Sequence, residues 1–480
     1  LFFGISNMWV RGVCLLVLLS LFRCSHALWT NKYGNSQNSQ VIDGNWADFQ
    51  NMVPFPSTGY DFMPGGISQP LSGTFDYIVQ LERGDLVTVV SGGAWLVQIS
   101  GTSNGSALLP FMSRFFLSKY TGTRSVTSLV AIGNRVVVAF SDAIICVSYD
   151  NSEGLPELVW NRTNSSTVPH IDVKVATNDS LIVWNYYYHY ISTYPYETTR
   201  YFSILALNLT DGSTIWNQQS PEGYGFLGGG GMSPYGVSGG GMSALNSNGT
   251  VVFFPFDFID GSSTTKYYLQ ALNAQSGDIV WTVTSTSESY YYLSVAPNGS
   301  SLYVFSQSVP SVSCFLSAFD ASTGSRLWQT TLSSRYDNSP PIVSLDGGAI
   351  AFRSYLPPRT YPQPGLESFL VVEATSGAVR CDMNLTSVIS CCTTSSVGGL
   401  QGITKDGYAL LKFGTDITAN SNYPFGAIDI SACSLDYMYS LGQMSYENTY
   451  SPNYVFTADG SIYFNSLHDQ PPIHSFTMTL

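Results

Sequence analysis

The chain has 480 residues, of which only 11% are charged and 14% are aromatic, and its formal net charge is −13. A negative chain without a cluster of Lys or Arg lacks the basic surface that nucleic acids require, so no nucleic-acid partner is expected. Low charge, together with abundant Tyr, Gly and small polar residues, is typical of an all-β protein outside the cytoplasm.

The first predicted element is a signal peptide over residues 1–27, with Met8 as the expected start of translation. A positively charged residue precedes the apolar stretch 13–22, and residues 25–27 form a small-x-small cleavage site. The stretch is too short to span a bilayer, and no later one reaches the about 18 apolar residues of a membrane helix. Residues 28–480 are therefore expected to form one domain, secreted or lumenal; an N-terminal membrane anchor is the alternative.

Eight turn dipeptides recur along the chain, about 54 residues apart on average, and each is followed by a strand of apolar residues. Asn, Asp and Gly are the residues that tight turns between strands favour. The dipeptides are Gly84-Asp85, Gly133-Asn134, Asn178-Asp179, Asn248-Gly249, Asn298-Gly299, Asp346-Gly347, Asp406-Gly407 and Asp459-Gly460. Four antiparallel strands in each unit of about 40 to 50 residues are the pattern of a β-propeller blade.

An eleven-residue hairpin pattern that ends on Trp follows several of these strands. Its copies are 206–216 (ALNLTDGSTIW), 271–281 (ALNAQSGDIVW), 318–328 (AFDASTGSRLW), 371–381 (VVEATSGAVRC, with Cys381 in the Trp place) and a looser one ending at Trp160. This repetition predicts an all-β, eight-bladed β-propeller of four-stranded antiparallel sheets, with seven blades as the alternative. The last unit has no Trp hairpin, so Trp29 or the stretch 41–49 is expected to supply its missing strands.

The form A-x-D-x-x-T-G-x-x-x-W of 318–328 resembles the tryptophan-docking repeat of quinoprotein alcohol dehydrogenases. It also resembles the repeats of their non-catalytic relatives, such as the propeller lipoprotein of bacterial outer-membrane assembly. The resemblance covers about 77–467 and is specific for the fold, whereas the family holds both enzymes and scaffolds. In that family the Trp of each blade stacks on the next blade. This implies a structural girdle formed by Trp160, Trp216, Trp281 and Trp328, from which Cys381 departs.

Two segments are candidate binding surfaces. The aromatic stretch 184–196 (WNYYYHYISTYPY) is suited to stacking on a sugar or packing on a protein, or else its alternate Tyr residues are buried between blades. The Gly-rich stretch 223–241 is expected to be an inserted surface loop, where binding residues concentrate. Its G-x-G-x-x-G and G-x-S-x-G sequences lack the strand and helix context that nucleotide binding or a nucleophilic Ser requires, so we attribute both to loop composition.

Eight N-x-S/T sequons are candidates for glycosylation in a secreted chain. Their acceptors are Asn104, Asn161, Asn164, Asn178, Asn208, Asn248, Asn298 and Asn384. Several lie in predicted turns, where an acceptor side chain must be exposed.

Four cysteines near the C-terminus are candidates for disulfides: Cys381, Cys391, Cys392 and Cys433. An oxidising compartment favours a local bond, and we expect Cys381 to lie near Cys391 or Cys392; a bond from one of that pair to Cys433 is the alternative. The adjacent pair is also similar to the cysteine pair that contacts the quinone in quinoprotein alcohol dehydrogenases. In those enzymes the pair lies early in the chain.

No catalytic, cofactor-binding or metal-binding residue can be assigned from the sequence. The histidines have no zinc spacing, and the Ca²⁺ ligands and Asp base implied by the dehydrogenase resemblance cannot be placed. We expect a binding or scaffold protein, without cofactor or metal, that recognises a protein or carbohydrate through one propeller face. The alternative is an alcohol dehydrogenase that depends on pyrroloquinoline quinone (PQQ) and Ca²⁺.

Overall fold

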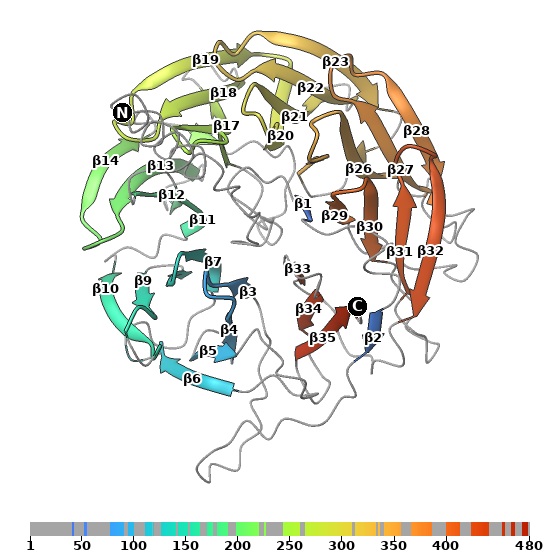
Figure 1. Cartoon of the computed structure of the whole chain (residues 1–480). Helices are drawn as coiled ribbons and strands as arrows, with labels where there is room; N and C mark the ends of the chain where they lie inside the picture. The colour runs from blue at the N-terminus through green and yellow to red at the C-terminus, as the bar shows by residue number, and fades with distance from the viewer. Residues whose placement is uncertain are drawn as a thin grey trace, which may run out of the picture.

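The computed structural model of the chain is a ring of β-sheets (Figure 1). It describes residues 41–42, 52–54, 77–90, 95–99, 111–117, 119, 126–140, 143–151, 154–163, 170–175, 180–190, 198–219, 225–226, 243–259, 265–309, 313–332, 335–336, 340–356, 366–385, 400–412, 424–440, 454–456, 462–465 and 473–478. All of the elements in these ranges are strands, and none of the described residues belongs to a helix able to cross a membrane. The expected signal peptide, 1–27, lies outside them.

The described strands form eight sheets, and the prediction of an all-β propeller is confirmed. In each of the first four sheets the strands follow one another from the centre of the ring to its outside (Figure 1). They are β3 (Tyr77–Gln80), β4 (Leu86–Val90), β5 (Trp95–Ile99), β6 (Phe111–Phe116); β7 (Val126–Ile132), β8 (Arg135–Phe140), β9 (Ala143–Ser148), β10 (Glu157–Thr163); β11 (His170–Val175), β12 (Ser180–Tyr190), β13 (Thr198–Asn208), β14 (Thr214–Gln219); and β15 (Gly225–Phe226), β16 (Ala244–Leu245), β17 (Val251–Ile259), β18 (Thr265–Asn273), β19 (Ile279–Ser285).

The remaining four sheets continue the ring in the same order. They are β20 (Glu288–Val295), β21 (Ser301–Ser308), β22 (Cys314–Asp320), β23 (Arg326–Leu332); β24 (Arg335–Tyr336), β25 (Ile342–Val343), β26 (Ala349–Leu356), β27 (Leu366–Glu373), β28 (Val379–Asn384); β1 (Val41–Ile42), β29 (Leu400–Thr404), β30 (Tyr408–Lys412), β31 (Pro424–Asp429), β32 (Ser434–Ser440); and β33 (Tyr454–Phe456), β34 (Ile462–Asn465), β35 (Ile473–Met478), β2 (Met52–Pro54).

The hydrophobic core lies between successive sheets. Six clusters of buried apolar side chains join the first seven sheets in order, each cluster filling one space between two neighbours. A sheet covered on both faces needs apolar residues at consecutive positions, not at alternate ones. For this reason β8 is buried from Val136 to Phe140, and β20 is buried along its whole length.

The N-terminal part of the chain completes the last sheet, but not through the residues that we expected. β2 pairs antiparallel with β35, with Met52 opposite Met478 and Pro54 opposite Phe476. The expectation is wrong for Val41–Ile42, which pairs parallel with β29 in the seventh sheet; Trp29 and residues 43–49 lie outside the described residues. The edge position of β2 suits Pro54, since proline has no backbone N–H to donate.

The two ends of the ring differ. Because neighbouring strands run antiparallel, the connections from the first to the second strand and from the third to the fourth strand leave from one end. We call this end the turn face and the opposite end the loop face. In the third to sixth sheets the outer connections of the turn face are the short turns 209–213, 274–278, 321–325 and 374–378.

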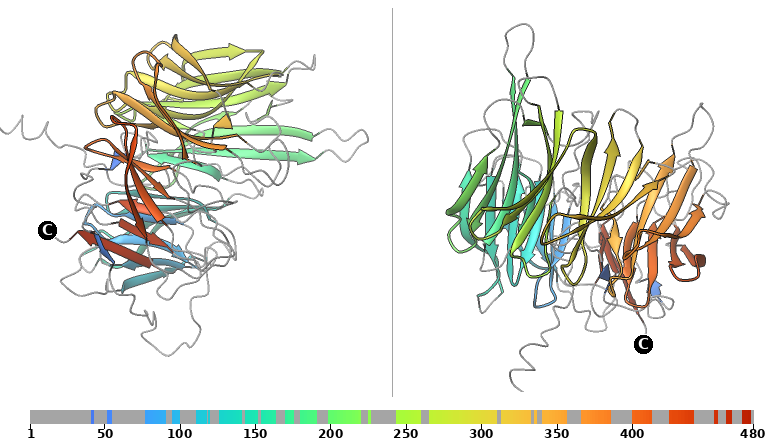
Figure 2. Two further views of the ribbon diagram at one scale, coloured as in Figure 1. Left: turned by 90° about the vertical axis from the view of Figure 1, so that its right-hand side faces the viewer. Right: turned by 90° about the horizontal axis from the view of Figure 1, so that it is seen from above.

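On the loop face one pair of strands extends beyond its sheet. β12 and β13 pair from Ser180 opposite Asn208 to Tyr190 opposite Thr198. β11 pairs β12 only as far as Asn185, and β14 pairs β13 only as far as Ser203. Within the part of the sheet that the structure describes, residues 186–190 and 198–202 therefore form a two-stranded ribbon without a third paired strand, and Figure 2 shows it projecting from the ring. We call it the projecting ribbon.

Candidate functional site

Four tryptophans join each of four sheets to the next one at the turn face. Each lies on an outer strand, and its indole N–H donates to a backbone carbonyl in the turn of the following sheet. The pairs are Trp160 Nε1 to Leu209 O (2.7 Å), Trp216 Nε1 to Ala274 O (2.9 Å), Trp281 Nε1 to Ala321 O (2.9 Å) and Trp328 Nε1 to Ala374 O (2.9 Å). The acceptor directly follows the Asp, Asn or Glu of the repeat, so each repeat docks on the next copy of itself.

Each indole ring also covers a glycine of the same turn. Gly212, Gly277, Gly324 and Gly377 have φ values of 72° to 76°, a conformation that side chains disfavour. A Cβ at any of these positions would lie 2.6 to 2.8 Å from an indole carbon. The turn therefore needs glycine for its backbone conformation and, independently, for the approach of the ring.

The residue two places after the Trp adds a second contact at three of these junctions. Arg162 Nη1 donates to Gly212 O at 3.3 Å, Gln218 Nε2 donates to Gly277 O at 3.1 Å, and Thr330 Oγ1 donates to Gly377 O at 2.5 Å. The same turn is thus held by its acceptor carbonyl, by its glycine carbonyl and by ring contact.

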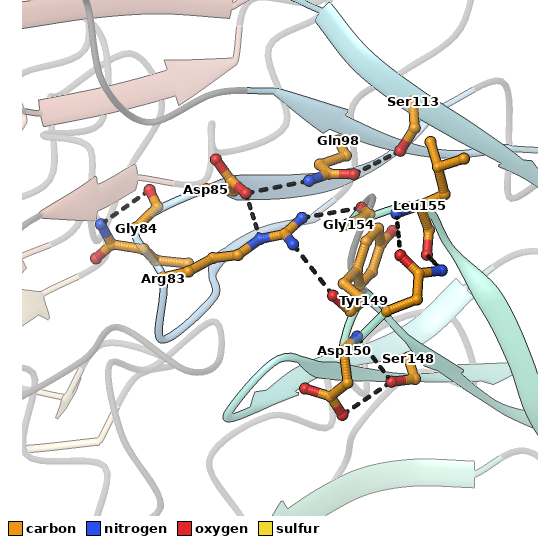
Figure 3. Close-up of polar contacts among 12 residues, drawn as sticks. Arg83, Gly84, Asp85, Gln98, Ser113, Ser148, Tyr149, Asp150, Gly154 and Leu155 are labelled. Atoms are coloured by element: carbon orange, nitrogen blue, oxygen red, sulfur yellow. Dashed lines mark hydrogen bonds and ion pairs between the residues drawn. The ribbon is translucent and has the colours of Figure 1, made fainter.

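At the first junction an arginine takes the place of the docking Trp (Figure 3). Arg83, from the turn between β3 and β4, donates through Nη1 to Tyr149 O and through Nη2 to Gly154 O, both at 3.1 Å. The register of β9 and β10 makes Tyr149 O the counterpart of the carbonyls that the Trp residues bind. Gly154 has a φ of 65°, and its Cβ position is filled by the guanidinium group. Arginine therefore docks on the same two features as Trp.

A buried polar network holds this arginine in place. Asp85 forms an ion pair with Arg83 Nε, Gln98 Nε2 donates to Asp85 Oδ2 at 3.1 Å, and Ser113 Oγ donates to Gln98 Oε1. Figure 3 shows the chain of contacts crossing from the outer strand β6 to Arg83. The guanidinium also lies over the ring of Tyr149, and burial raises the pKa of that phenol above its ordinary value. The network restricts Arg83 to the docking orientation.

At the junction of the sixth and seventh sheets a disulfide takes the place of the Trp and the Gly together. Cys381 holds the Trp position on β28 and is bonded to Cys433, with Cα atoms 5.5 Å apart. Ala427 pairs with Tyr437 in the register that the other repeats use, which places Cys433 at the glycine position of its turn. Cys433 is the only non-glycine residue with positive φ among the described residues, at 53°. The two positions that touch at the Trp junctions are covalently joined here.

This bond corrects the expected pairing of Cys381. We expected Cys391 or Cys392 as the neighbour because they are close in sequence, but contact between the sheets brings Cys433 to Cys381. Cys391 and Cys392 lie outside the described residues. The bond also identifies 427–437 (AIDISACSLDY) as a further copy of the repeat, which pattern reading missed because its Gly and its Trp are both replaced.

Comparisons with known proteins agree with this arrangement. The family described as outer membrane protein assembly factor BamB matches residues 235–355, about a quarter of the chain. A quinohemoprotein alcohol dehydrogenase from Comamonas testosteroni has a similar structure, with a TM-score of 0.58, 10% identity and coverage of 96% of this chain and 82% of that one. The chain is a β-propeller, and residues 235–355 within it match this PQQ-repeat family.

A europium-containing methanol dehydrogenase also has a similar structure, with a TM-score of 0.56 and 11% identity over 93% of this chain and 90% of that one. No curated protein matches the chain by sequence. At these identities the likeness to the two enzymes shows the shared fold alone.

Among the described residues of the propeller, Glu288 is a buried carboxylate with several donors around it. It accepts from Ser306 Oγ at 2.5 Å, from Arg326 Nη2 at 2.7 Å and from Gln329 Nε2 at 3.0 Å. All four residues belong to the fifth sheet, and Glu288 is only 9% exposed. With its oxygens engaged by its own sheet, this carboxylate stabilises the packing of that sheet. Burial, and then the charge of Glu288, raise the pKa of Tyr290 to about 12.

The described residues offer no set of side chains for a metal. No group of three or more His, Cys, Asp or Glu residues is placed to hold an ion in the ranges that the structure describes. Burial raises the pKa of the Cys146 thiol to about 12, so this group stays protonated and is a poor nucleophile at neutral pH.

The candidate binding segments lie mainly outside the described residues. Of the Gly-rich stretch, Gly225 and Phe226 form β15, which pairs with Phe258 and Asp257 of β17. Of the aromatic stretch, residues 184–190 belong to β12, and residues 186–190 among them form part of the projecting ribbon.

Five of the eight sequon acceptors are described, and they lie in different surroundings. Asn161 is on the outer strand β10 and Asn384 is at the end of β28. Asn208, Asn248 and Asn298 are at turns of the turn face in the third, fourth and fifth sheets. Asn104, Asn164 and Asn178 lie outside the described residues.

Proposed function

We propose that this PQQ-repeat propeller is a secreted binding or scaffold protein that recognises a protein or carbohydrate through its loop face. The observation that supports this choice is the projecting ribbon on one face, set against a turn face whose side chains and backbone are used to hold the ring together.

In the outer turns of the turn face, backbone polar groups are already used in hydrogen bonds within the ring. In the turn 321–325, Asp320 N donates to Ser325 O and Gly324 N donates to Asp320 O, both at 2.8 Å. The carbonyl of Ala321 accepts from the docking Trp281. The same bonds recur in the turns 209–213, 274–278 and 374–378. The backbone groups of these turns are therefore already used in contacts that hold the ring together.

The loop face carries a feature that the fold does not require. An isolated two-stranded ribbon is at best marginally stable in water, and the projecting ribbon extends beyond the strands that support its sheet. Its sequence contains Tyr186, Tyr187, Tyr188 and Tyr190. Tyrosine offers a large, rigid contact area at a low cost in side-chain entropy, which is why binding surfaces favour it. A partner on this ribbon would explain both its length and its composition.

The dehydrogenase alternative requires a different arrangement. A Ca²⁺-assisted quinone enzyme needs several oxygen ligands that converge on the ion beside the cofactor. The described residues do not present such a set, and the similar structures support the fold alone, so the binding role is the better supported proposal.

The test compares the whole mature chain with a variant whose ribbon is shortened. Because Tyr187 pairs with Tyr201, residues 188–200 can be replaced by Asn-Gly without changing the register. The matched control replaces residues 308–313 by Asn-Gly between Gln307 and Cys314, which also pair with each other on the loop face. Each protein is applied to a glycan array, and a photo-crosslinking residue at position 194 or 322 tests for bound proteins in extracellular fluid.

We expect the wild type and the control to bind, the shortened variant to lose at least tenfold in affinity, and crosslinks to form from position 194 only. Crosslinks from position 322 would contradict the assignment of the face. Dye-linked alcohol oxidation after addition of PQQ and Ca²⁺ would contradict the proposal itself.

A further inference from the structure

Two asparagines occupy equivalent inner turns of neighbouring sheets. Asn248 lies in the connection between β16 and β17, and Asn298 lies in the connection between β20 and β21. Both are exposed, and each is followed two residues later by a hydroxyl residue, Thr250 or Ser300. The innermost strands end in these turns, so both asparagines lie toward the centre of the ring on the turn face (Figure 1).

In both turns the asparagine oxygen contacts the hydroxyl residue. Asn248 Oδ1 accepts from Thr250 Oγ1 at 2.6 Å and from Thr250 N at 3.3 Å. Asn298 Oδ1 accepts from Ser300 Oγ at 2.8 Å and from Ser300 N at 3.0 Å. These bonds form Asx turns, in which the side chain replaces a backbone acceptor. The oxygen therefore has a structural role in each turn.

The corresponding turn of the sixth sheet meets the same structural need without an amide. There Asp346 Oδ1 accepts from Gly348 N at 2.9 Å and from Ser344 Oγ at 2.6 Å. A carboxylate oxygen thus supports this turn as well as an amide oxygen does, and Gly348 stands where the other two turns have a hydroxyl. The fold accounts for Oδ1 in the fourth and fifth sheets. It does not account for the amide nitrogen, and the sixth sheet forms the corresponding turn with Gly348 in place of the hydroxyl residue.

We propose that Asn248 and Asn298 carry N-linked oligosaccharides, which make the inner rim of the turn face a glycan-covered surface. In the transfer, the amide Nδ2 forms a bond to C1 of the first sugar and loses one proton. The bond from C1 to oxygen in a lipid-pyrophosphate-linked oligosaccharide breaks, and the lipid pyrophosphate leaves with the electron pair. The step involves no oxidation or reduction.

The two glycans would lie side by side. A Cβ at Gly299 would lie 2.5 Å from Ser247 Oγ, so the inner turns of the fourth and fifth sheets are in contact. The next inner turn is also close, since a Cβ at Gly347 would lie 3.8 Å from Pro297 Cδ. Sugars on two adjoining turns would shield the centre of this face from macromolecules. This leaves the loop face open, although the modification itself does not depend on a partner binding there.

The test uses the full chain secreted from a eukaryotic host. Peptides are treated with an N-glycosidase in ¹⁸O-water, which converts each glycosylated Asn to ¹⁸O-labelled Asp. A parallel digest without the enzyme is essential, because both sites are Asn-Gly sequences that deamidate spontaneously. Asn298→Asp keeps the turn acceptor and removes Nδ2, whereas Ser300→Ala keeps the amide and removes the hydroxyl. Each variant should lose one glycan, and its melting temperature should stay within about 2 °C of the wild-type value.

A gain-of-site variant completes the design. Asp346→Asn combined with Gly348→Ser places the same sequon in the sixth sheet, where it should add one glycan. Enzyme-dependent label at Asn248 and Asn298 supports the inference, and unlabelled Asn at both positions in the secreted protein overturns it. The readout is the mass of a peptide, so a negative result is distinct from failure of partner binding in the ribbon experiment.

Discussion

Exchanging the disulfide between the sixth and seventh sheets for a Trp and Gly pair tests whether the two are equivalent docking devices. The variant is Cys381→Trp with Cys433→Gly, and its matched control is Cys381→Ala with Cys433→Gly. At the four Trp junctions the ring covers a glycine and donates to the carbonyl of a neighbouring residue. In the exchanged junction that carbonyl would belong to Ile430, by the register of β31 and β32.

The two devices contribute similar amounts to the free energy of unfolding. The disulfide joins residues 52 apart in sequence, and restricting the unfolded chain by a loop of that size contributes about 4 kcal/mol. Losing a packed Trp side chain costs about 3–5 kcal/mol. Glycine at position 433 also relieves the strain of a side chain at φ 53°, by about 1 kcal/mol. The control should therefore lose about 3–4 kcal/mol, and the exchanged variant should recover most of it.

Urea denaturation monitored by circular dichroism, with and without reductant, measures both effects. We expect reductant to lower the midpoint of the wild type and to leave that of the exchanged variant unchanged. If the exchanged variant is no more stable than its Ala and Gly control, then position alone does not define the docking contact. A wild-type midpoint that is insensitive to full reduction would refute the stabilising role of the disulfide.

Three other results should follow from the same contacts. Gly324→Ala should lower the free energy of unfolding by about 2–4 kcal/mol, because the new Cβ would contact the indole ring of Trp281 and the backbone φ is unfavourable for a side chain. The control Gly84→Ala should cost only about 1–2 kcal/mol, since nothing lies within 4 Å of its Cβ. Equal losses in thermal denaturation would contradict the ring contact. Arg83→Lys should cost about 2 kcal/mol, since one ammonium nitrogen does not reproduce the planar guanidinium group whose three nitrogens contact Tyr149 O, Gly154 O and Asp85. An unchanged urea midpoint would argue against Arg83 as a docking residue. Hydrogen bonds from the Ser322 side chain and the Thr323 backbone lower the pKa of Asp320. The contribution of this carboxylate to folding stability is therefore present above the unfolded pKa of about 4 and is lost as pH falls through the folded pKa. Asp320→Asn should lose stability less steeply than the wild type below about pH 4, and an unchanged acid profile would show that Asp320 does not contribute to acid unfolding.

The fold could be read from the sequence because its repeat contains its own packing contact. Trp281 and Gly324 are the two sides of one junction, and both are visible at fixed places in consecutive copies of the repeat. The spacing of the turn dipeptides then supplies the number of strands in each unit. The Trp contacts lie where a docking repeat requires them, although only mutation tests their contribution to stability.

The sequence was a poorer guide where a different residue makes the same contact. Arg83 comes from an inner turn and not from the outer strand of its sheet, so no spacing rule connects it to Gly154. Cys381 and Cys433 each depart from the repeat, and their relation is visible only when both are placed on facing turns. The N-terminal strands were misassigned for a similar reason, because pairing of two or three residues, as in β1 and β2, leaves almost no pattern in a sequence.

The disulfide lies next to the part of the ring that strands from the N-terminal region complete. The seventh and eighth sheets each take a strand from the N-terminal region, and these strands, Val41–Ile42 and Met52–Pro54, contribute only two or three residues to the pairing. Such short strands form few backbone hydrogen bonds, and they close a loop that spans almost the whole chain, so their attachment carries a large entropic cost. A covalent bond from Cys381 to Cys433 fixes the seventh sheet to the sixth independently of those strands. Because the four Trp junctions and the disulfide junction use the same docking position, changing the pair of residues there changes the strength of one junction without altering the fold.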